Sequence, residues 1–323
     1  MADILYLKYL HIEIVMINRT LIRIKVVQIV YAFYQNQDRS LDNGEKELLF
    51  SLSKSYDLYN QMLYFMVKIT EYSRKRIDTG RNKMRPTVED LAPNEKFANN
   101  RFIQQLEVNA QLLQYIETSK KDWAVESNYI KELYDTILAS DIYKEYMASE
   151  EDSWEADREV WRKIYKKIIQ TSESLDQMLE EQSLYWNDDK EIVDSFVLKT
   201  IRRFEEAKGA KQEILPEYKD QEDMEYASRL FRRTIENQEY YYQLIQAACR
   251  NWDFNRIAFM DLIIMQIVLA EILSFPNIPI SVSINEFLDI AKLYSTQKSA
   301  SFINGTLDGI VKQLKKDGKL LKK

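Results

Sequence analysis

Glycine and proline are scarce in this chain of 323 residues, which contains 6 Gly and 5 Pro. Average usage of these two residues together is about 12%. β-Sandwiches and barrels need turn residues that adopt a positive φ, and doubly wound nucleotide-binding folds need glycine-rich loops where the backbone meets phosphate. The scarcity therefore predicts an all-α fold of long helices joined by few loops.

Histidine and cysteine, which many catalytic and zinc sites use, are almost absent. Cys249 is the single cysteine and His11 the single histidine, which excludes Ser-His-Asp and Cys-His catalysis and a zinc site built on these side chains. The sequence contains neither GxxxxGK[ST] nor GxGxxG. We expect no enzyme, no cofactor and no metal, although a site made of carboxylates alone stays open. A lone thiol suits a reducing cytoplasm.

Charge is distributed unevenly along the chain. The formal net charge is −6, which by itself argues against a nucleic-acid-binding protein. However, Met16 to Arg39 carries a net +3, the tail from Lys312 a net +5, and Asp141 to Asp194 a net −9. A local basic patch can still bind polyanions if the fold brings the two basic ends together.

Two apolar stretches raise the question of targeting. Residues 1–15 are apolar but interrupted by polar side chains, and we expect translation to start at Met16, with 1–15 as an extension. Ile257–Phe275 is long enough to span a bilayer but carries Asp261 and Glu271, each costing about 2.5–3.5 kcal/mol at mid-membrane. We therefore expect a buried helix and no membrane association.

Helical periodicity extends over nearly the whole chain. It predicts helices at about 17–34, 41–76, 97–118, 126–147, 153–184, 188–208, 220–249, 254–274, 284–294 and 299–316. Gly80, Pro86 and Pro93 interrupt the pattern in a linker at 79–96, and Pro216 marks a second break. Ser283-Ile284-Asn285-Glu286 has the pattern of a capping box that would start the helix after it.

A weak internal repeat appears when the chain is shifted by 66 residues. Five identities then align over about thirty positions, among them Asp157 with Asp223 and Trp186 with Trp252. Shared helical composition would produce a similar score, so the sequence leaves a true duplication open.

Two short segments are more informative than composition. The first is Arg19-Thr-Leu-Ile-Arg-Ile-Lys-Val-Val-Gln-Ile-Val-Tyr31, and the second is Ile278-Pro-Ile-Ser-Val-Ser-Ile-Asn-Glu-Phe-Leu-Asp-Ile-Ala-Lys292 followed by Ser299-Ala-Ser-Phe-Ile-Asn-Gly-Thr-Leu-Asp308. Both resemble the NusB family of transcription antitermination factors, whose members show similar "R…R…Q.LY" and "IP…V.INE…LAK…S..FVNGVLD" sequences in this order.

The resemblance covers about Met16–Gln37 and Asp220–Leu314 and implies a NusB-like helical bundle of two subdomains. The segment between them has no counterpart in ordinary members. We therefore expect an extension at 1–15, NusB-like helices at 16–78, an inserted acidic helical region at 79–219, and a C-terminal NusB-like domain with a basic tail at 220–323.

The family resemblance also implies a function. NusB proteins pair with NusE, a ribosomal protein, and the pair binds the boxA element of nascent ribosomal RNA, which helps RNA polymerase to resist termination. The residues here suit that role, since helix N-termini favour phosphate and single-stranded RNA is read by aromatic stacking and hydrogen bonds to base edges. The expected RNA-binding residues are Arg19, Arg23, Lys25, Gln28, Tyr31, Lys292, Lys298, Ser299 and Phe302, and the expected partner-binding residues are Asp261 and Glu271.

Each of these residues also has a structural interpretation. Spaced cations commonly form a solvated helix face, Tyr31 and Phe302 fall on apolar stripes, and Lys292 could cap the negative end of its helix. Glu271 could be structural, and Asn304-Gly305 could be a close packing point between helices. An alternative function is a helical interaction scaffold that has lost RNA binding. NusB-like helices also occur fused to RNA methyltransferases, but the glycine-rich cofactor domain is missing here.

The insertion has no role in the family pattern. Its negative charge argues against direct RNA contact, and our hypothesis is that it either mimics a missing partner or docks a basic protein such as NusE or a polymerase subunit. Its tryptophans are expected core anchors: Trp123, Trp154, Trp161 and Trp186.

Overall fold

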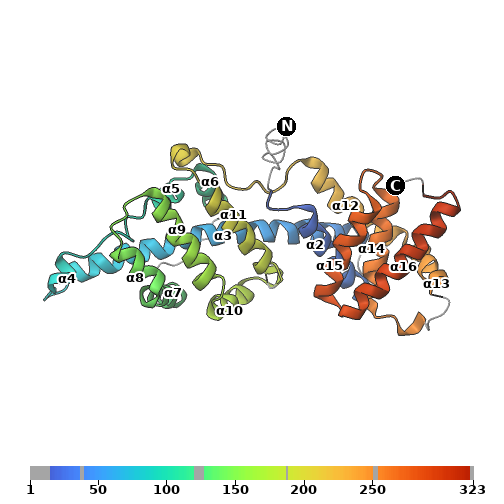
Figure 1. The fold of residues 1–323 in the computed structure, drawn as a ribbon, viewed down its shortest axis with the longest axis horizontal. Coiled ribbons are helices and arrows are strands. Elements are labelled where there is room, and N and C mark those ends of the chain that lie inside the picture. Colours follow the sequence, from blue (N-terminus) through green and yellow to red (C-terminus); the bar gives the residue numbers. More distant parts are fainter. Residues whose placement is uncertain (1–14, 37–39, 120–126, 187, 250–253, 321–323) are drawn as a thin grey trace. The chain divides into compact units, whose positions relative to one another are not determined.

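The computed structural model describes residues 15–36, 40–119, 127–186, 188–249 and 254–320 (Figure 1). Helices are the only regular secondary structure in these ranges, which confirms the predicted all-α class. The extension at 1–15 lies outside the described residues, except for Val15. Among the described helices, none is both long and apolar enough to cross a bilayer.

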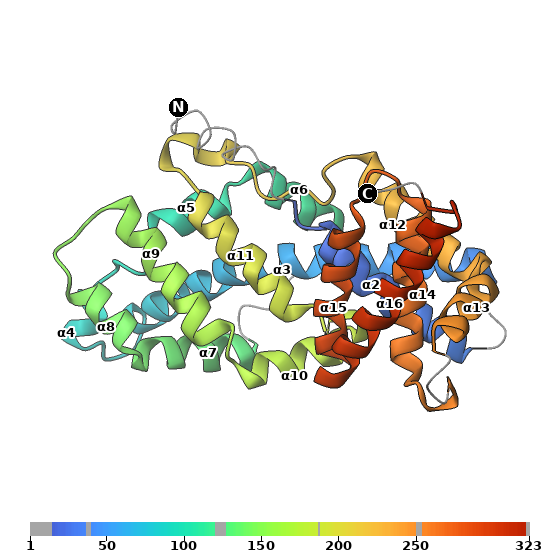
Figure 2. The same ribbon diagram turned by 45° about the vertical axis from the view of Figure 1, so that its right-hand side comes forward.

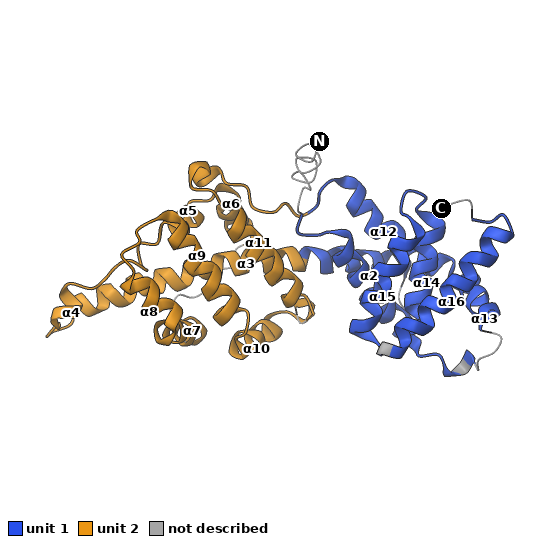
Figure 3. Ribbon diagram, viewed as in Figure 1, with its two compact units in different colours: residues 1–53, 218–323 blue, residues 54–217 orange. Residues whose placement is uncertain are grey.

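The chain divides into two compact units (Figure 3), residues 1–53 with 218–323 and residues 54–217. The division falls inside α3, so the segment expected at 16–78 contributes to both units. The first unit contains the start of α3 (Leu41–Arg81) and α2 (Arg19–Gln35), α12 (Gln221–Glu236), α13 (Gln238–Ala248), α14 (Phe259–Ser274), α15 (Ile280–Tyr294) and α16 (Gln297–Lys316).

The second unit contains the rest of α3 and eight further α-helices within its described residues. These are α4 (Val88–Leu91), α5 (Arg101–Glu107), α6 (Ala110–Ser119), α7 (Asn128–Ala139), α8 (Asp141–Ala148), α9 (Trp154–Ile164), α10 (Glu173–Gln182) and α11 (Lys190–Arg203). A π-helical turn at Tyr165–Ile169 continues α9.

In the first unit, α14 is the central helix. It packs against α2, α12, α13, α15 and α16 (Figure 2). All residues from Ile263 to Ile272 are buried, because neighbours surround this helix on every side. This explains why its sequence is apolar enough to resemble a membrane span.

In the second unit, α9 contacts α5, α8 and α11. Its Trp161 is fully buried, and its ring stacks on Phe97 with centroids 5.3 Å apart. Trp154 and Trp186 are 4% and 2% exposed, which confirms them as core residues. Trp123 lies outside the described residues.

The helices of the second unit are shorter than predicted, because polar side chains end them without glycine or proline. The segment expected as one helix at 97–118 breaks at Asn109, whose Oδ1 accepts from the Leu112 amide. Ser140 caps α8 and Ser172 caps α10 in the same way. These residues offer the backbone amides an alternative acceptor, so they start a new helix where composition alone predicts continuity.

Three further expectations are corrected. Helix α3 continues through Gly80 to Arg81 instead of ending near residue 76. Helix α15 begins at Ile280, after Pro279, so Ser283 lies buried inside the helix and starts no capping box. Gly305 is not a close packing point, since a Cβ there would have open space around it.

Candidate nucleic-acid interface

The start of α2 carries the first of the predicted RNA-binding cations. Asn18 caps the helix, because its Oδ1 accepts a hydrogen bond from the Leu21 amide at 2.9 Å. Arg19 is the first helical residue, where free amides and the helix dipole favour anions. Its side chain is 36% exposed, so solvent can reach the guanidinium.

Two carboxylates of α12 hold Arg19. Its Nε donates to Oδ1 of Asp223 at 3.1 Å, and its Nη2 donates to Oε1 of Glu222 at 3.1 Å. Burial opposes its positive charge and is the largest single effect, but the hydrogen bonds that Arg19 donates to the two carboxylates and the negative charge of Asp223 together raise the pKa of Arg19. A phosphate at Arg19 must therefore compete with carboxylates that are already in place.

Arg23, one helical turn further on, lies in the core. Only 3% of the residue is exposed, and its Nε donates to Oε1 of the fully buried Glu271 at 2.9 Å. Tyr226 also donates to this carboxylate, because burial and the charge of Glu271 raise the pKa of Tyr226 well above its usual range. Arg23 and Glu271 therefore act as structural residues, and their burial argues against direct contact with RNA or a partner. The same holds for Lys25, which is 2% exposed.

The middle of α2 meets the start of α14 and the end of α15. Gln28 donates from Nε2 to the hydroxyl of Tyr294 at 2.9 Å. The Tyr31 ring packs against Phe259, with centroids 5.7 Å apart at 57°. Tyr31 and Phe259 are 39% and 42% exposed, so both rings present area to solvent.

The junction of α14, α15 and α16 is tied together by hydroxyl groups. Ser295 donates from Oγ to Oδ1 of Asp261 at 2.7 Å, and the same Oγ lies within hydrogen-bonding distance, 2.9 Å, of Oγ of Ser299. Ser299 and Thr296 form the capping box that starts α16. Asp261 and Ser299 are 5% and 7% exposed, so both position the junction more than they offer surface.

These contacts link α2 to α15, α2 to α14, and α14 to the end of α15. We name the residues that form them the α2–α14–α15 patch. Its members are Gln28, Tyr31, Phe259, Asp261, Tyr294 and Ser295. The patch combines two exposed aromatic rings with amide, hydroxyl and carboxylate groups. Such a surface can stack bases and bind their edges.

The remaining predicted residues lie on α15 and α16. Lys298 is exposed at the start of α16, one residue before Ser299 of the junction. Lys292 is also exposed, and its Nζ lies 2.6 Å from Oδ1 of Asp289 on the same helix. Phe302 is half-buried one turn along α16. Lys298 is thus the predicted cation nearest in sequence to the junction.

The predicted RNA-binding residues therefore fall into two groups. Arg19 precedes Gln28 by nine residues on α2, a distance of about 13 Å along a helix with a rise of 1.5 Å per residue. Arg19 pairs with the acidic start of α12, whereas Gln28 and Tyr31 belong to the patch.

Sequence reasoning missed Phe259 and Tyr294. Phe259 opens the most apolar segment of the chain, where periodicity assigns an aromatic residue to the core. Tyr294 lies between the two quoted parts of the second family-like segment. Only the exposed area and the contacts of these side chains reveal their place.

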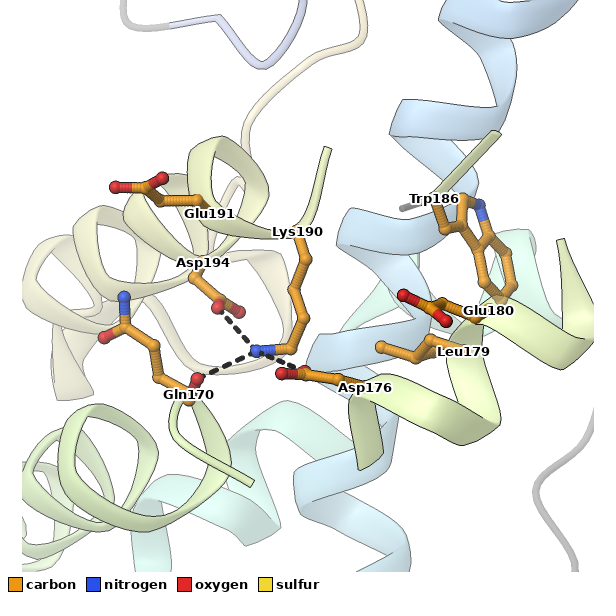
Figure 4. A pocket seen from close by; sticks show the side chains of 8 residues that line it. All are labelled: Gln170, Asp176, Leu179, Glu180, Trp186, Lys190, Glu191 and Asp194. Carbon is orange, nitrogen blue, oxygen red and sulfur yellow. Dashed lines mark hydrogen bonds and ion pairs between the residues drawn. The ribbon is translucent and has the colours of Figure 1, made fainter. Parts of the chain in front are cut away.

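A pocket of about 270 Å³ in the second unit offers a comparison (Figure 4). Lys190 occupies it, with its Nζ 2.9 Å from Oδ2 of Asp194 and 3.1 Å from Oδ1 of Asp176. Tyr165 donates to Asp194 at 2.6 Å, and burial raises the pKa of this carboxyl despite the lysine. Lys190 thus ties α10, which carries Asp176, to its own helix α11, and we interpret this arrangement as structural.

Within the described ranges, no three His, Cys, Asp or Glu side chains are grouped so that they could hold a metal ion.

A comparison with known proteins finds similarity to one family. The family model described as "NusB family" matches residues 195–312, which includes α12 to α15. "Transcription antitermination protein NusB" of Salinibacter ruber is 33% identical over 132 residues, which are 39% of this chain and 82% of that protein.

Two further relatives carry the same name. The protein of Natranaerobius thermophilus is 35% identical over 108 residues, 32% of this chain and 78% of its own length. The protein of Clostridium kluyveri is 41% identical over 93 residues, 29% of this chain and 60% of its own length. No solved structure matched the chain.

Proposed function

The chain belongs to the NusB family, and from this premise we propose that it is a non-catalytic transcription antitermination protein. In this role it binds boxA-type ribosomal RNA leader sequence together with NusE and supports processive transcription by RNA polymerase. The proposal places the protein in the cytoplasm, where the transcript is made.

The observation that carries the RNA-binding part is the α2–α14–α15 patch. Tyr31 and Phe259 supply exposed rings for stacking on splayed bases. Gln28 and Ser295 supply groups that hydrogen-bond base edges. Lys298, which is exposed one residue before Ser299, supplies a positive charge for the backbone phosphates.

Asp261 contributes through its neighbours. It accepts from Ser295 at 2.7 Å and so fixes the junction between α14 and α15. We propose that NusE docks beside this junction. Glu271 is fully buried and takes no part in that contact.

A binding titration of the full chain with a single-stranded RNA carrying a boxA-like sequence, with and without NusE, tests the proposal. The logarithm of the binding constant should fall with the logarithm of salt concentration, with a slope of about −0.7 per neutralised phosphate. Absence of RNA binding, with NusE binding retained, would favour the alternative of a scaffold that has lost RNA binding.

Removing the aromatic rings tests the patch itself. Tyr31→Ala together with Phe259→Ala should weaken RNA binding by about 5- to 150-fold, since one stacked base is worth about 1–3 kcal/mol. Tyr240→Ala is the matched control, because Tyr240 is 38% exposed on α13 and lies outside the patch. Equal losses in both variants would place the RNA elsewhere.

A further inference from the structure

The 66-residue repeat of the sequence reappears in the helices. When the shift is applied, α9 with its π-helical turn falls on α12, α10 on α13, and α11 on the first part of α14. The end of α10 at Gln182 matches the end of α13 at Ala248. The packing follows the same order, since α9 contacts α11 as α12 contacts α14.

The buried faces of the paired helices also coincide. Six positions of α9 and its π-helical turn are buried at residues whose partners 66 positions later are buried in α12. The pairs are Asp157 with Asp223, Val160 with Tyr226, Trp161 with Ala227, Ile164 with Leu230, Tyr165 with Phe231, and Ile168 with Thr234. Helical periodicity alone would give each helix a buried stripe. It does not require the two stripes to coincide at a shift of 66 residues, which was chosen from sequence identities and not from burial.

A second helix in each unit repeats the same start. Asn100 caps α5 by accepting from the Ile103 amide at 3.1 Å, and Arg101 is the first helical residue. Asn18 and Arg19 begin α2 in the same way.

The two arginines then make the same ion pair. Arg101 Nε donates to Asp157 at 2.8 Å, as Arg19 Nε donates to Asp223 at 3.1 Å. Both arginine side chains are 36% exposed. Asp157 lies in the first turn of α9, and Asp223 lies in the first turn of α12.

A third contact shows the same correspondence between the two units. Four residues after each arginine lie Gln105 and Arg23. Gln105 donates from Nε2 to the backbone carbonyl of Glu205 at 3.0 Å, whereas Arg23 donates to the carboxylate of Glu271 at 2.9 Å. Glu205 and Glu271 are themselves 66 residues apart. Helical composition does not predict that the receiving residues match as well as the donors.

The two arrangements diverge where the patch begins. Helix α5 ends at Glu107, and Asn109 caps the start of the next helix, α6. Helix α2, in contrast, continues without interruption through Gln28 and Tyr31. The charges diverge too, since the first unit carries 20 basic and 19 acidic residues and the second 25 basic and 32 acidic.

We propose that the second unit contains a degenerate copy of the α2–α12–α13–α14 framework, in which Arg101 and Asp157 are the positioning residues that correspond to Arg19 and Asp223. The copy keeps the anchor at the start of the helix and has lost the half that carries the RNA-binding patch. RNA binding is therefore confined to the first unit, and this part of the inference rests on the proposed function.

Hydrogen exchange of the full chain tests the anchor without using RNA. Arg101→Met and Asp157→Asn should each raise amide exchange in α5 and α9 by about tenfold, with little further increase in the double variant, because residues of one ion pair are not additive. Arg19→Met and Asp223→Asn should act likewise on α2 and α12. If Arg101→Met unfolds too far to be measured, Arg101→Lys takes its place. This variant keeps the positive charge, so amide protection in α5 and α9 should lie between that of the parent and that of Asp157→Asn.

Arg162→Met is the matched control on α9, since among the described residues Arg162 forms its ion pair along its own helix, with Glu159 at 2.6 Å. Amide exchange in this variant should stay within about twofold of the parent. Additive effects of the Arg101 and Asp157 changes would overturn the anchor.

Titration of the same variants with RNA tests whether the first unit binds RNA without a contribution from the second unit. Arg101→Met should leave RNA affinity within about twofold of the parent. A loss of affinity and of salt slope in this variant would overturn the inference, because the second unit would then bind RNA. If the parent binds no RNA, the proposed function fails while hydrogen exchange still decides whether the anchor is shared.

Discussion

The pairing of Arg23 with Glu271 gives the sharpest prediction about stability. Glu271 is fully buried and Arg23 is 3% exposed, with 2.9 Å between Nε and Oε1. Arg23→Met keeps the length of the side chain and removes its charge. The variant leaves a carboxylate in the core with Tyr226 as a neutral donor.

The cost follows from the geometry. Two unit charges about 2.9 Å apart attract each other by about 6 kcal/mol at an effective dielectric constant of about 20. Desolvation offsets part of this attraction, and removal of one partner from a buried pair costs about 3–5 kcal/mol. For a unit of this size, that loss lowers the melting temperature by about 6–20 °C.

Replacing both partners should behave differently. In Arg23→Met with Glu271→Leu, no charge of this pair is left in the core, so stability should return to within about 1–2 kcal/mol of the parent. Urea unfolding followed by circular dichroism measures the free energies, and hydrogen exchange assigns the loss to α2, α12 and α14.

An exposed ion pair in the same unit provides the control. Lys292→Met removes a partner of Asp289, but the lysine side chain is 57% exposed, so the change should stay within about 0.5–1 kcal/mol. The reasoning is refuted if Arg23→Met costs no more than this control, or if the double variant is no more stable than Arg23→Met.

Three other perturbations have defined outcomes. Gly44→Ala should cost about 1–3 kcal/mol in urea unfolding, because a Cβ there would lie 2.6 Å from a phenylalanine ring carbon, whereas Gly305→Ala, with open space around it, should stabilise its helix by about 0.5–1 kcal/mol. Trp161→Ala should cost about 3–5 kcal/mol and raise hydrogen exchange in the second unit only, since the ring is fully buried. The hydrogen bond from Arg232 lowers the pKa of Glu45, so this group stabilises the fold above its unfolded pKa of about 4.3 and loses that effect as pH falls. Unfolding midpoints from pH 3 to 7 should therefore show a shallower acid limb in Glu45→Gln, and an unchanged limb would contradict the assignment.

Secondary structure was predictable wherever the apolar pattern was long and uninterrupted. Helix α2 begins within two residues of its predicted start, and α14 ends at Ser274 as expected. Four long segments were predicted as single helices but each consists of two, because a new helix begins after Asn109, Ser140 and Ser172 in the second unit and after Asn237 in the first. Serine and asparagine also occur inside helices, so their presence in a sequence gives a weaker signal than glycine or proline.

The candidate site was predictable in part. The family-like segments drew attention to Gln28, Tyr31 and Ser299, and the structure brings the elements that carry them together. Phe259 was hidden by its apolar surroundings, since periodicity cannot distinguish an aromatic ring at the rim of a core from one inside it.

The sequence by itself determined that the chain is helical and charge-segregated, since these properties follow from composition and spacing. Only the tertiary structure decided which of its cations are accessible. Arg19 and Arg23 lie one turn apart on the same face of α2 and look equivalent in sequence. One is 36% exposed as a side chain, while the other is enclosed with a fully buried glutamate. The physical reason is that helical spacing fixes which residues share a face, whereas the helices packed on that face decide whether a charge meets solvent or another charge.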